Sequence, residues 1–223
     1  MKKELETLFM NYTGKIPDKI ETLSSSGSNR TYFRLTAGAC SCVGVEGTVA
    51  EENRTFCALA SHFASKGINV PEVYAVSPDG MCYLQEDLGR ESLFDRISAG
   101  RLGGNYSAEE VSLLKKTISK LPDIQIKGAE GWDFSRCFHS TSFNRRSIMF
   151  DLNYFKYCFL KTSGLEFNEE RLEDDFSALA GILLESGGDS FMYRDFQSRN
   201  VMIKDGEPYF IDFQGGRKGP VYY

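Results

Sequence analysis

Three side chains near the C-terminal end of the chain have the types and the spacing that phosphoryl transfer requires. Asp195 and Asn200 lie five positions apart on one predicted loop, and Asp212 follows twelve positions after Asn200. A carboxylate can accept the proton of an attacking hydroxyl, while an amide oxygen and a second carboxylate can hold magnesium on nucleotide phosphates. We therefore predict that Asp195 is catalytic and that Asn200 and Asp212 bind Mg²⁺ beneath ATP.

A predicted hairpin explains why these residues should meet. The apolar segments 201–203 and 209–211 are typical of two strands, and the turn between them contains Asp-Gly. Such a hairpin places Asn200 and Asp212 near each other at one end. Taken singly, each residue could be an ordinary capping or turn residue, but their joint spacing favours the catalytic interpretation.

The order of these residues matches the kinase pattern H-R-D-L-x-x-x-N … D-F-G, with Tyr193 in place of His and Gln214 in place of Gly. Two arginines flank the catalytic loop. For Arg194 we expect a structural salt bridge. Arg199 is a candidate catalytic residue that balances the charge of the transferred phosphate, although a structural salt bridge is an equal alternative.

The turn between the first two predicted strands is a candidate phosphate-binding loop, because backbone N–H groups of small residues can surround an anion. It matches neither G-x-G-x-x-G nor G-x-x-x-x-G-K-[ST], and a plain hairpin turn is the alternative. A kinase would also pair Glu52 with a strand lysine, which is missing here, so Arg34 or Arg30 is the candidate replacement. The predicted phosphate-binding residues are Ser26, Gly27, Ser28, Asn29, Arg30 and Arg34.

A short connector follows the last apolar strand of the N-terminal half. Its backbone groups at Gln85, Glu86 and Asp87 could pair with the adenine edge of a nucleotide, whatever the side chains are. A plain linker is the alternative interpretation. We carry these three residues as candidate cofactor-binding positions.

Bulk properties indicate a globular protein and exclude several classes. The chain has 223 residues, a net charge of −5 and a pI near 5.2, so neither nucleic acid nor a membrane is expected as a partner. Neither a signal peptide nor an apolar run of about eighteen residues is apparent, and the six cysteines suit reduced thiols, so we expect a cytoplasmic protein. With only two histidines, a zinc site or a His-based triad is poorly supported.

Hydrophobic periodicity predicts an α+β protein with two lobes. We expect residues 1–86 to form a lobe of antiparallel strands with one main helix, 87–90 a hinge, and 91–223 a mostly helical lobe. A cleft between the lobes would hold the nucleotide. The predicted helices of the second lobe are 91–98, 107–121, 145–163 and 168–186, and its most loop-like stretches are 100–107 and 127–144.

Four segments together resemble the aminoglycoside phosphotransferase and choline kinase superfamily, which has a protein-kinase-like fold. Within it, the chain is most similar to bacterial sugar kinases of the N-acetylmuramate/N-acetylglucosamine 1-kinase type. The resemblance runs from about residue 20 to the end of the chain. The segments that carry it are Gly27–Leu35, Glu52–Phe56, Glu86–Gly89 and Tyr193–Met202.

This resemblance implies ATP- and Mg²⁺-dependent phosphorylation of a small hydroxylated metabolite, and the sugar-kinase likeness implies an amino sugar as that metabolite. It assigns Asp195 as the base, Asn200 and Asp212 to magnesium, and 26–30 to the phosphates. The alternatives are an aminoglycoside- or choline-directed kinase, or a degenerate kinase-like module that binds nucleotide or a partner without transfer. Relatives continue beyond the equivalent of Tyr223 with further helices, so the helical lobe is expected to be incomplete. A fragment would expose apolar surface that those helices cover, and a missing C-terminal region or fused domain is possible.

Overall fold

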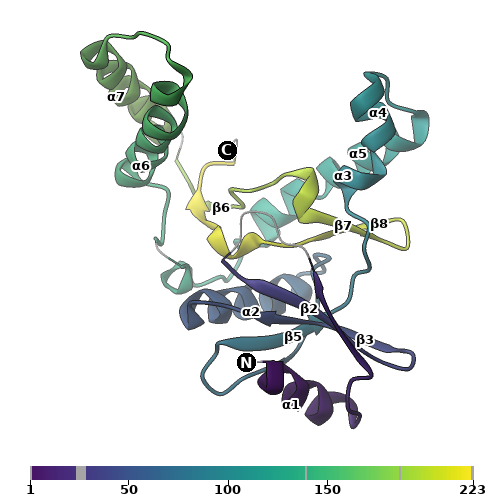
Figure 1. Cartoon of the computed structure of the whole chain (residues 1–223). Helices are drawn as coiled ribbons and strands as arrows, with labels where there is room; N and C mark the ends of the chain where they lie inside the picture. The colour runs from purple at the N-terminus through teal and green to yellow at the C-terminus, as the bar shows by residue number, and fades with distance from the viewer. Residues whose placement is uncertain (1, 24–28, 139, 186, 222–223) are drawn as a thin grey trace.

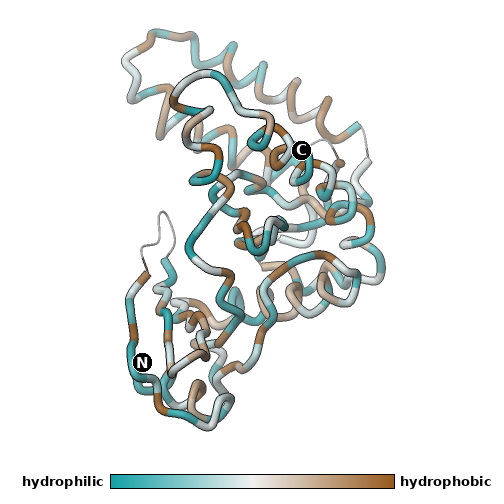
Figure 2. The backbone as a smooth tube through the Cα atoms, turned by 90° about the vertical axis from the view of Figure 1, so that its right-hand side faces the viewer, coloured by the Kyte–Doolittle hydropathy of each residue, from teal (hydrophilic) through white to brown (hydrophobic). Residues whose placement is uncertain are grey.

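The computed structural model describes residues 2–23, 29–138, 140–185 and 187–221 (Figure 1). Its N-terminal part is a β-sheet with two helices, and its C-terminal part is mainly helical with two short two-stranded ribbons. In a view rotated by 90° about the vertical axis, the sheet again lies below the helical part (Figure 2). The predicted α+β class, with an N-terminal antiparallel sheet and a helical C-terminal part, is confirmed.

The sheet has five strands in the order β1-β2-β3-β5-β4, and all neighbours are antiparallel. Side chains of successive residues in a strand point to opposite faces, so both faces of the sheet can be covered. Phe33 and Leu35 pack with α1 (Lys2–Thr13), whereas Tyr32 packs against the core next to α2 (Ala50–Ser65). The strands are β1 (Lys19–Leu23), β2 (Thr31–Ala37), β3 (Cys40–Glu46), β4 (Val73–Val76) and β5 (Cys82–Glu86).

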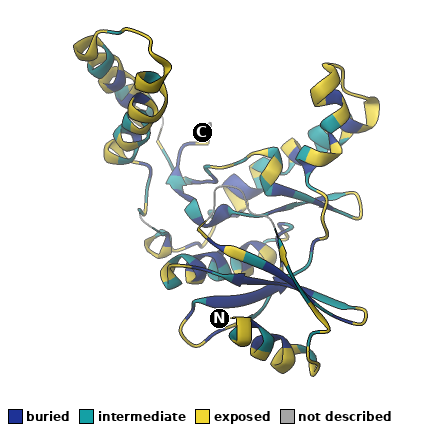
Figure 3. Cartoon of the chain, viewed as in Figure 1, coloured by how far each residue is buried: buried dark blue, intermediate teal, exposed yellow. Residues whose placement is uncertain are grey.

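The largest core joins α2 to the C-terminal part. Phe56 of α2 stacks on Phe213 with ring centroids 4.8 Å apart, and Phe63 meets the same ring edge-on at 5.2 Å. Phe63 also contacts Phe191 edge-on at 5.0 Å. These rings are buried, as are most residues of the central strands (Figure 3). Because Phe213 directly follows Asp212, this packing fixes α2 relative to the predicted magnesium ligand.

Helices make up most of the chain between β5 and the final ribbons. α5 begins with a capping box, in which Ser107 and Glu110 exchange side-chain-to-backbone hydrogen bonds. α6 packs against α7, and this pair stands apart from α3, α4 and α5 (Figure 1). The elements are α3 (Leu93–Arg96), α4 (Ser98–Gly103), α5 (Ala108–Ser119), η1 (Asp123–Lys127), η2 (Phe134–Arg136), α6 (Arg145–Phe155), η3 (Lys156–Leu160), η4 (Lys161–Ser163) and α7 (Glu169–Glu185).

Two antiparallel ribbons carry the predicted site. The first is the expected hairpin of β7 (Val201–Lys204) and β8 (Glu207–Phe210). The second pairs β6 (Ser190–Met192) with β9 (Arg217–Gly219), and the sequence did not predict it. The catalytic loop and the segment around Asp212 both run between these ribbons, with one short 3₁₀ turn in each, η5 (Ser198–Asn200) and η6 (Phe213–Gly215).

Two predictions about helices were wrong in detail. The segment 145–163, predicted as one helix, is α6 followed by the π turn η3 and the 3₁₀ turn η4. Part of the predicted loop 100–107 belongs to α4, which ends at Gly103 and is followed by Gly104 with a left-handed backbone (φ 77°). Glycines lower helix propensity, but they do not prevent a short helix where neighbouring elements support it.

The α6–α7 pair carries exposed apolar side chains on its outer surface. Phe150 is 70% exposed and Phe159 of η3 is 60% exposed, and hydrophobic residues lie along the helices at the top of Figure 2. Apolar surface is thus exposed in the helical part. None of the described helices is both long and apolar enough to cross a membrane.

Candidate active site

The end of the β7–β8 hairpin brings Asn200 and Asp212 together, and the preceding loop carries Asp195. The hairpin register aligns the two strand ends, and the Ile211 N–H donates to the Asn200 carbonyl at 3.0 Å. The Asn200 amide nitrogen lies 3.0 Å from the Asp195 backbone carbonyl and 3.5 Å from Asp212 Oδ2. The three residues predicted from their spacing therefore lie in one place.

Asp195 lies among charged groups that act on its carboxyl. Arg194, directly before it, has a left-handed backbone (φ 74°), and its guanidinium pairs with Asp151 of α6 at 3.0 Å. Asp195 reaches solvent, but the surrounding protein removes part of its hydration, and this raises its pKa above the ordinary 3.8. The Arg194 charge opposes this shift, whereas the charges of Asp212 and Asp151 add to it. A carboxylate with a raised pKa suits a group that accepts a proton.

Tyr193 occupies the position of the histidine in the kinase pattern and has a structural role. It is buried, and its hydroxyl donates to the Ile211 carbonyl. Its ring meets Phe196 and Phe210 edge-on. Burial raises the pKa of Tyr193 well above 10.0, so the hydroxyl stays a donor. Since Ile211 directly precedes Asp212, the hydrogen bond fastens the catalytic loop to the segment with the second carboxylate.

The Asp212 carboxylate is held in place by the backbone around it and by the side chain of Gln214. Asp212 has a left-handed backbone (φ 66°), and the Phe213 ring behind it is fully buried against α2. Gln214 Nε2 lies 2.7 Å from Asp212 Oδ1 and 3.4 Å from Glu52 Oε1 of α2. Oδ1 is therefore taken by an amide donor, and Oδ2 faces Asn200.

Arg30 supplies the positive charge beside Glu52. The two side chains form an ion pair at 2.7 Å, and the Arg30 side chain is only 3% exposed. Its guanidinium also lies 5.8 Å from the centre of the Phe56 ring. Of the two arginines considered as replacements for the strand lysine, Arg30 is the one that pairs with Glu52.

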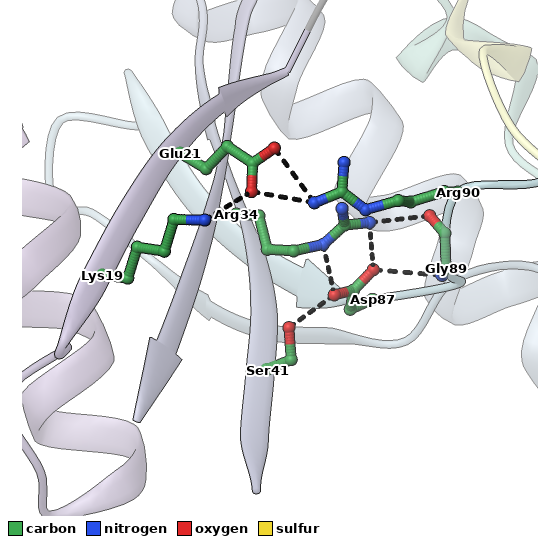
Figure 4. Close-up of polar contacts among 7 residues, drawn as sticks. All are labelled: Lys19, Glu21, Arg34, Ser41, Asp87, Gly89 and Arg90. Carbon is green, nitrogen blue, oxygen red and sulfur yellow. Dashed lines mark hydrogen bonds and ion pairs between the residues drawn. The ribbon is translucent and has the colours of Figure 1, made fainter. Parts of the chain in front are cut away.

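Arg34 instead fixes the connector between the two parts (Figure 4). Its Nε and Nη2 lie 2.7 and 2.8 Å from the two oxygens of Asp87, and Nη2 also donates to the Gly89 carbonyl at 2.7 Å. Asp87 further accepts hydrogen bonds from the Ser41 hydroxyl and from the Gly89 N–H. The Asp87 side chain is thus fully engaged by protein. Gln85 and Glu86 belong to β5, and the Glu86 N–H donates to the Glu72 carbonyl at 2.8 Å. An exposed layer of ion pairs lies next to this network and consists of Lys19, Glu21 and Arg90.

The other two connector residues have different surroundings. Gln85 is buried, and its Oε1 has no hydrogen-bond partner among the residues that the structure describes. Glu86 pairs with Lys204 of β7 and so connects the sheet to the hairpin. Both positions remain predictions as nucleotide contacts.

The predicted phosphate loop is described only at its end. Asn29 is exposed, directly before the buried Arg30. Ser26, Gly27 and Ser28 lie outside the described residues, so their role stays a prediction.

Arg199 contacts α3 in the described part of the chain. Its guanidinium stacks on the ring of Phe94 in α3, 3.7 Å from the ring centre, and Arg101 stacks on the same ring at 3.9 Å. Its role with the transferred phosphate stays a prediction.

The donor set at the hairpin end fits magnesium. Within the described ranges, no group of three or more His, Cys, Asp or Glu side chains is arranged to hold a metal ion. Magnesium usually needs only one or two protein oxygens, since phosphate and water complete its shell. The Asn200 nitrogen donates to the Asp195 carbonyl at 3.0 Å and lies 3.5 Å from Asp212 Oδ2. The Asn200 side-chain oxygen and Asp212 Oδ2 are the protein oxygens that would hold the cation.

Comparison with known proteins shows the family of this chain. The sequence profile of the phosphotransferase enzyme family (APH) matches residues 19–223. The chain belongs to this family. Two similar curated proteins are the N-acetylmuramate/N-acetylglucosamine kinases of Pseudomonas aeruginosa and Pseudomonas putida, each 26% identical, over 93% and 99% of this chain. The chain spans 58% and 62% of the length of these two relatives.

The fold is also shared with solved family members. An aminoglycoside phosphotransferase in a ternary complex with AMP-PNP and hygromycin B matches with a TM-score of 0.58 and 16% identity. The match covers 98% of this chain and 73% of that one. At this identity the likeness shows the fold, and it confirms the kinase-like architecture predicted from the sequence.

Two site residues have roles that the sequence pattern did not predict. Gln214 was noted only as a departure from the glycine of the kinase pattern, and its amide contacts two carboxylates. Tyr193 was noted only as a departure from histidine. In each case the signal was the atypical residue itself, in a motif that otherwise fits.

Proposed function

We propose that the chain is the ATP- and Mg²⁺-dependent catalytic part of a small-molecule kinase that phosphorylates a hydroxyl, with an amino sugar as the acceptor. The observation that carries the proposal is the convergence of Asp195, Asn200 and Asp212 at the end of one hairpin. Membership of a phosphotransferase family supports the same chemistry.

Each residue has a role that follows from its position. Asp195 orients the acceptor hydroxyl and takes its proton, which its raised pKa favours. Asn200 and Asp212 hold magnesium, which when bound neutralises charge on the transferred phosphoryl group. Catalysis of this kind rests on positioning and electrostatics more than on covalent chemistry.

The nucleotide is held by the N-terminal part. Arg30, kept in place by Glu52, neutralises the phosphates in place of the strand lysine. The loop 26–29 donates backbone N–H groups to them. The connector backbone at 85–87 pairs with the adenine edge through groups other than the Glu86 N–H, which donates to the Glu72 carbonyl. Arg34 keeps that connector in place through Asp87.

The choice of an amino sugar rests on the two curated relatives, whose names state N-acetylmuramate and N-acetylglucosamine. The chain spans less than two thirds of their length. An aminoglycoside- or choline-directed kinase is the alternative within the family.

The test is ADP release from Mg²⁺-ATP with a panel of N-acetylglucosamine, N-acetylmuramate, choline and an aminoglycoside. We expect release with the amino sugars, and a loss of about 10²- to 10⁴-fold in Asp195→Asn with ATP binding retained. Asp175→Asn on the exposed face of α7 is the matched control and should keep wild-type turnover. Equal turnover in Asp195→Asn and the control would remove Asp195 from its role.

A second candidate is a kinase-like module that binds nucleotide without transfer. The missing strand lysine favours it. Mg²⁺-ATP would then raise the melting temperature while no acceptor in the panel gives ADP above background.

A further inference from the structure

Gln214 lies between two carboxylates that belong to different parts of the fold. Its side-chain nitrogen is 2.7 Å from Oδ1 of Asp212 and 3.4 Å from Oε1 of Glu52. The side chain is buried, with 8% of the residue exposed. A buried amide donor beside two acceptors of negative charge makes charge-assisted hydrogen bonds, which are stronger than neutral ones.

The contacts of Gln214 extend to the predicted phosphate-binding arginine. Arg30 and Gln214 both contact the same oxygen of Glu52, at 2.7 and 3.4 Å. Asp212 Oδ2, the oxygen that Gln214 leaves open, faces the Asn200 amide at 3.5 Å. A continuous chain of polar contacts therefore runs from the start of β2 through α2 to the end of the hairpin.

Packing of the Phe213 ring fixes the position of these polar contacts relative to α2. The Phe213 ring, between the two residues that carry the contacts, stacks on Phe56 one turn after Glu52 on α2. A buried aromatic ring cannot move far without opening a cavity. Packing against α2 therefore fixes the backbone of Gln214. The Gln214 amide can in turn hold the Asp212 carboxylate in one orientation.

We propose that Gln214 is a positioning residue, whose amide holds Asp212 in the orientation that presents Oδ2 to magnesium and couples this carboxylate to the Arg30–Glu52 pair. The inference rests on the proposed function and goes beyond it, since a glycine at this position, as in the D-F-G pattern, could make neither contact. Without the amide, Asp212 would lie close to Glu52 with no donor between them, and like charges repel.

The test measures cation binding separately from catalysis. Mn²⁺ affinity is measured by electron paramagnetic resonance in the presence of AMP-PNP, for the wild-type chain and for Gln214→Met, which keeps the length of the side chain but cannot donate. We expect Mn²⁺ to bind about tenfold or more weakly, as the loss of a hydrogen bond to a charged group implies. AMP-PNP binding in EDTA should stay near the wild-type value.

Gln125→Met is the matched control. Gln125 is equally buried, but its amide donates to the Val221 carbonyl, outside this site. It should leave Mn²⁺ affinity unchanged. Gln214→Asn, which keeps the amide but is one methylene shorter, should also weaken Mn²⁺ binding, and it serves if Gln214→Met does not fold.

The outcomes are distinguishable. Mn²⁺ affinity equal to wild type in both folded Gln214 variants would overturn the inference and leave the proposed function standing. A parallel loss of cation-free AMP-PNP binding would also overturn it, because Gln214 would then support only the fold. No Mn²⁺-dependent AMP-PNP binding by the wild-type chain would overturn the proposed function, and this inference with it.

Discussion

Replacing Asp87 with asparagine keeps the size of the side chain and removes its charge from the connector between the two parts. Asp87 accepts two hydrogen bonds from Arg34, at 2.7 and 2.8 Å, and others from Ser41 and the Gly89 N–H. The side chains of Arg34 and Asp87 are 9% and 11% exposed, so solvent screens the pair little. Asp87→Asn therefore leaves a buried guanidinium without its counter-charge.

The expected loss of stability follows from this burial. Breaking a buried ion pair by removing one partner costs about 3–5 kcal/mol. Arg34 keeps its hydrogen bond to the Gly89 carbonyl, so we expect a value near the lower end, about 3 kcal/mol. For a chain of this length, this corresponds to a fall in Tm of roughly 6–12 °C.

The assay is urea denaturation together with thermal melting of wild type, Asp87→Asn and Glu21→Gln. Glu21 pairs with Arg90, whose side chain is 66% exposed, and this pair should contribute little. In a double-mutant cycle, Arg34→Met combined with Asp87→Asn should cost less than the sum of the single changes. A melting temperature for Asp87→Asn no lower than that of Glu21→Gln would refute the reasoning.

The pH dependence of stability tests the same ion pair independently. Burial tends to raise the pKa of Asp87, but the hydrogen bonds and charge of Arg34, with Ser41 and the Gly89 N–H, outweigh burial and lower it below 3.8. A lowered pKa stabilises the fold above the ordinary value, and the contribution is lost as the pH falls through the lowered value. The stability difference between wild type and Asp87→Asn should therefore be full at neutral pH and shrink only below about pH 4.

Two further predictions concern α2 and its partners. Phe213→Ala should cost about 3–5 kcal/mol by urea denaturation because its ring is fully buried against Phe56 and Phe63, whereas Phe159→Ala, at 60% exposure, should stay within about 0.5 kcal/mol of wild type. Equal losses for the two would contradict the packing described. Arg30→Met should weaken the binding of Mg²⁺ and a fluorescent ATP analogue by about tenfold or more, while Arg90→Met should not, since the Arg90 side chain is 66% exposed and pairs with Glu21. Unchanged binding in Arg30→Met would assign the phosphates to other residues.

Local signals were sufficient for much of the fold and for the centre of the site. The Asp-Gly turn of the β7–β8 hairpin fixes the strand register, so the meeting of Asn200 and Asp212 could be predicted from spacing. Hydrophobic periodicity predicted an N-terminal lobe of antiparallel strands with one main helix, and the structure has five antiparallel strands there, with α2 as the longer helix.

Long-range choices could not be made from the sequence. Arg30 directly precedes β2 and Arg34 lies in the middle of it. Only the positions of α2 and the connector decide which partner each arginine finds. The β6–β9 ribbon joins two three-residue strands that are far apart in the chain, so no local pattern marks it. The π turn η3 keeps the apolar spacing of a helix, so periodicity alone cannot separate it from α6.

The most direct test of the central claim is a crystal structure of the chain with Mg²⁺ and AMP-PNP. We expect the cation to be bound directly by the side chains of Asn200 and Asp212, with the γ-phosphate directed toward Asp195. A cation held elsewhere, or a nucleotide bound away from these three side chains, would contradict the account.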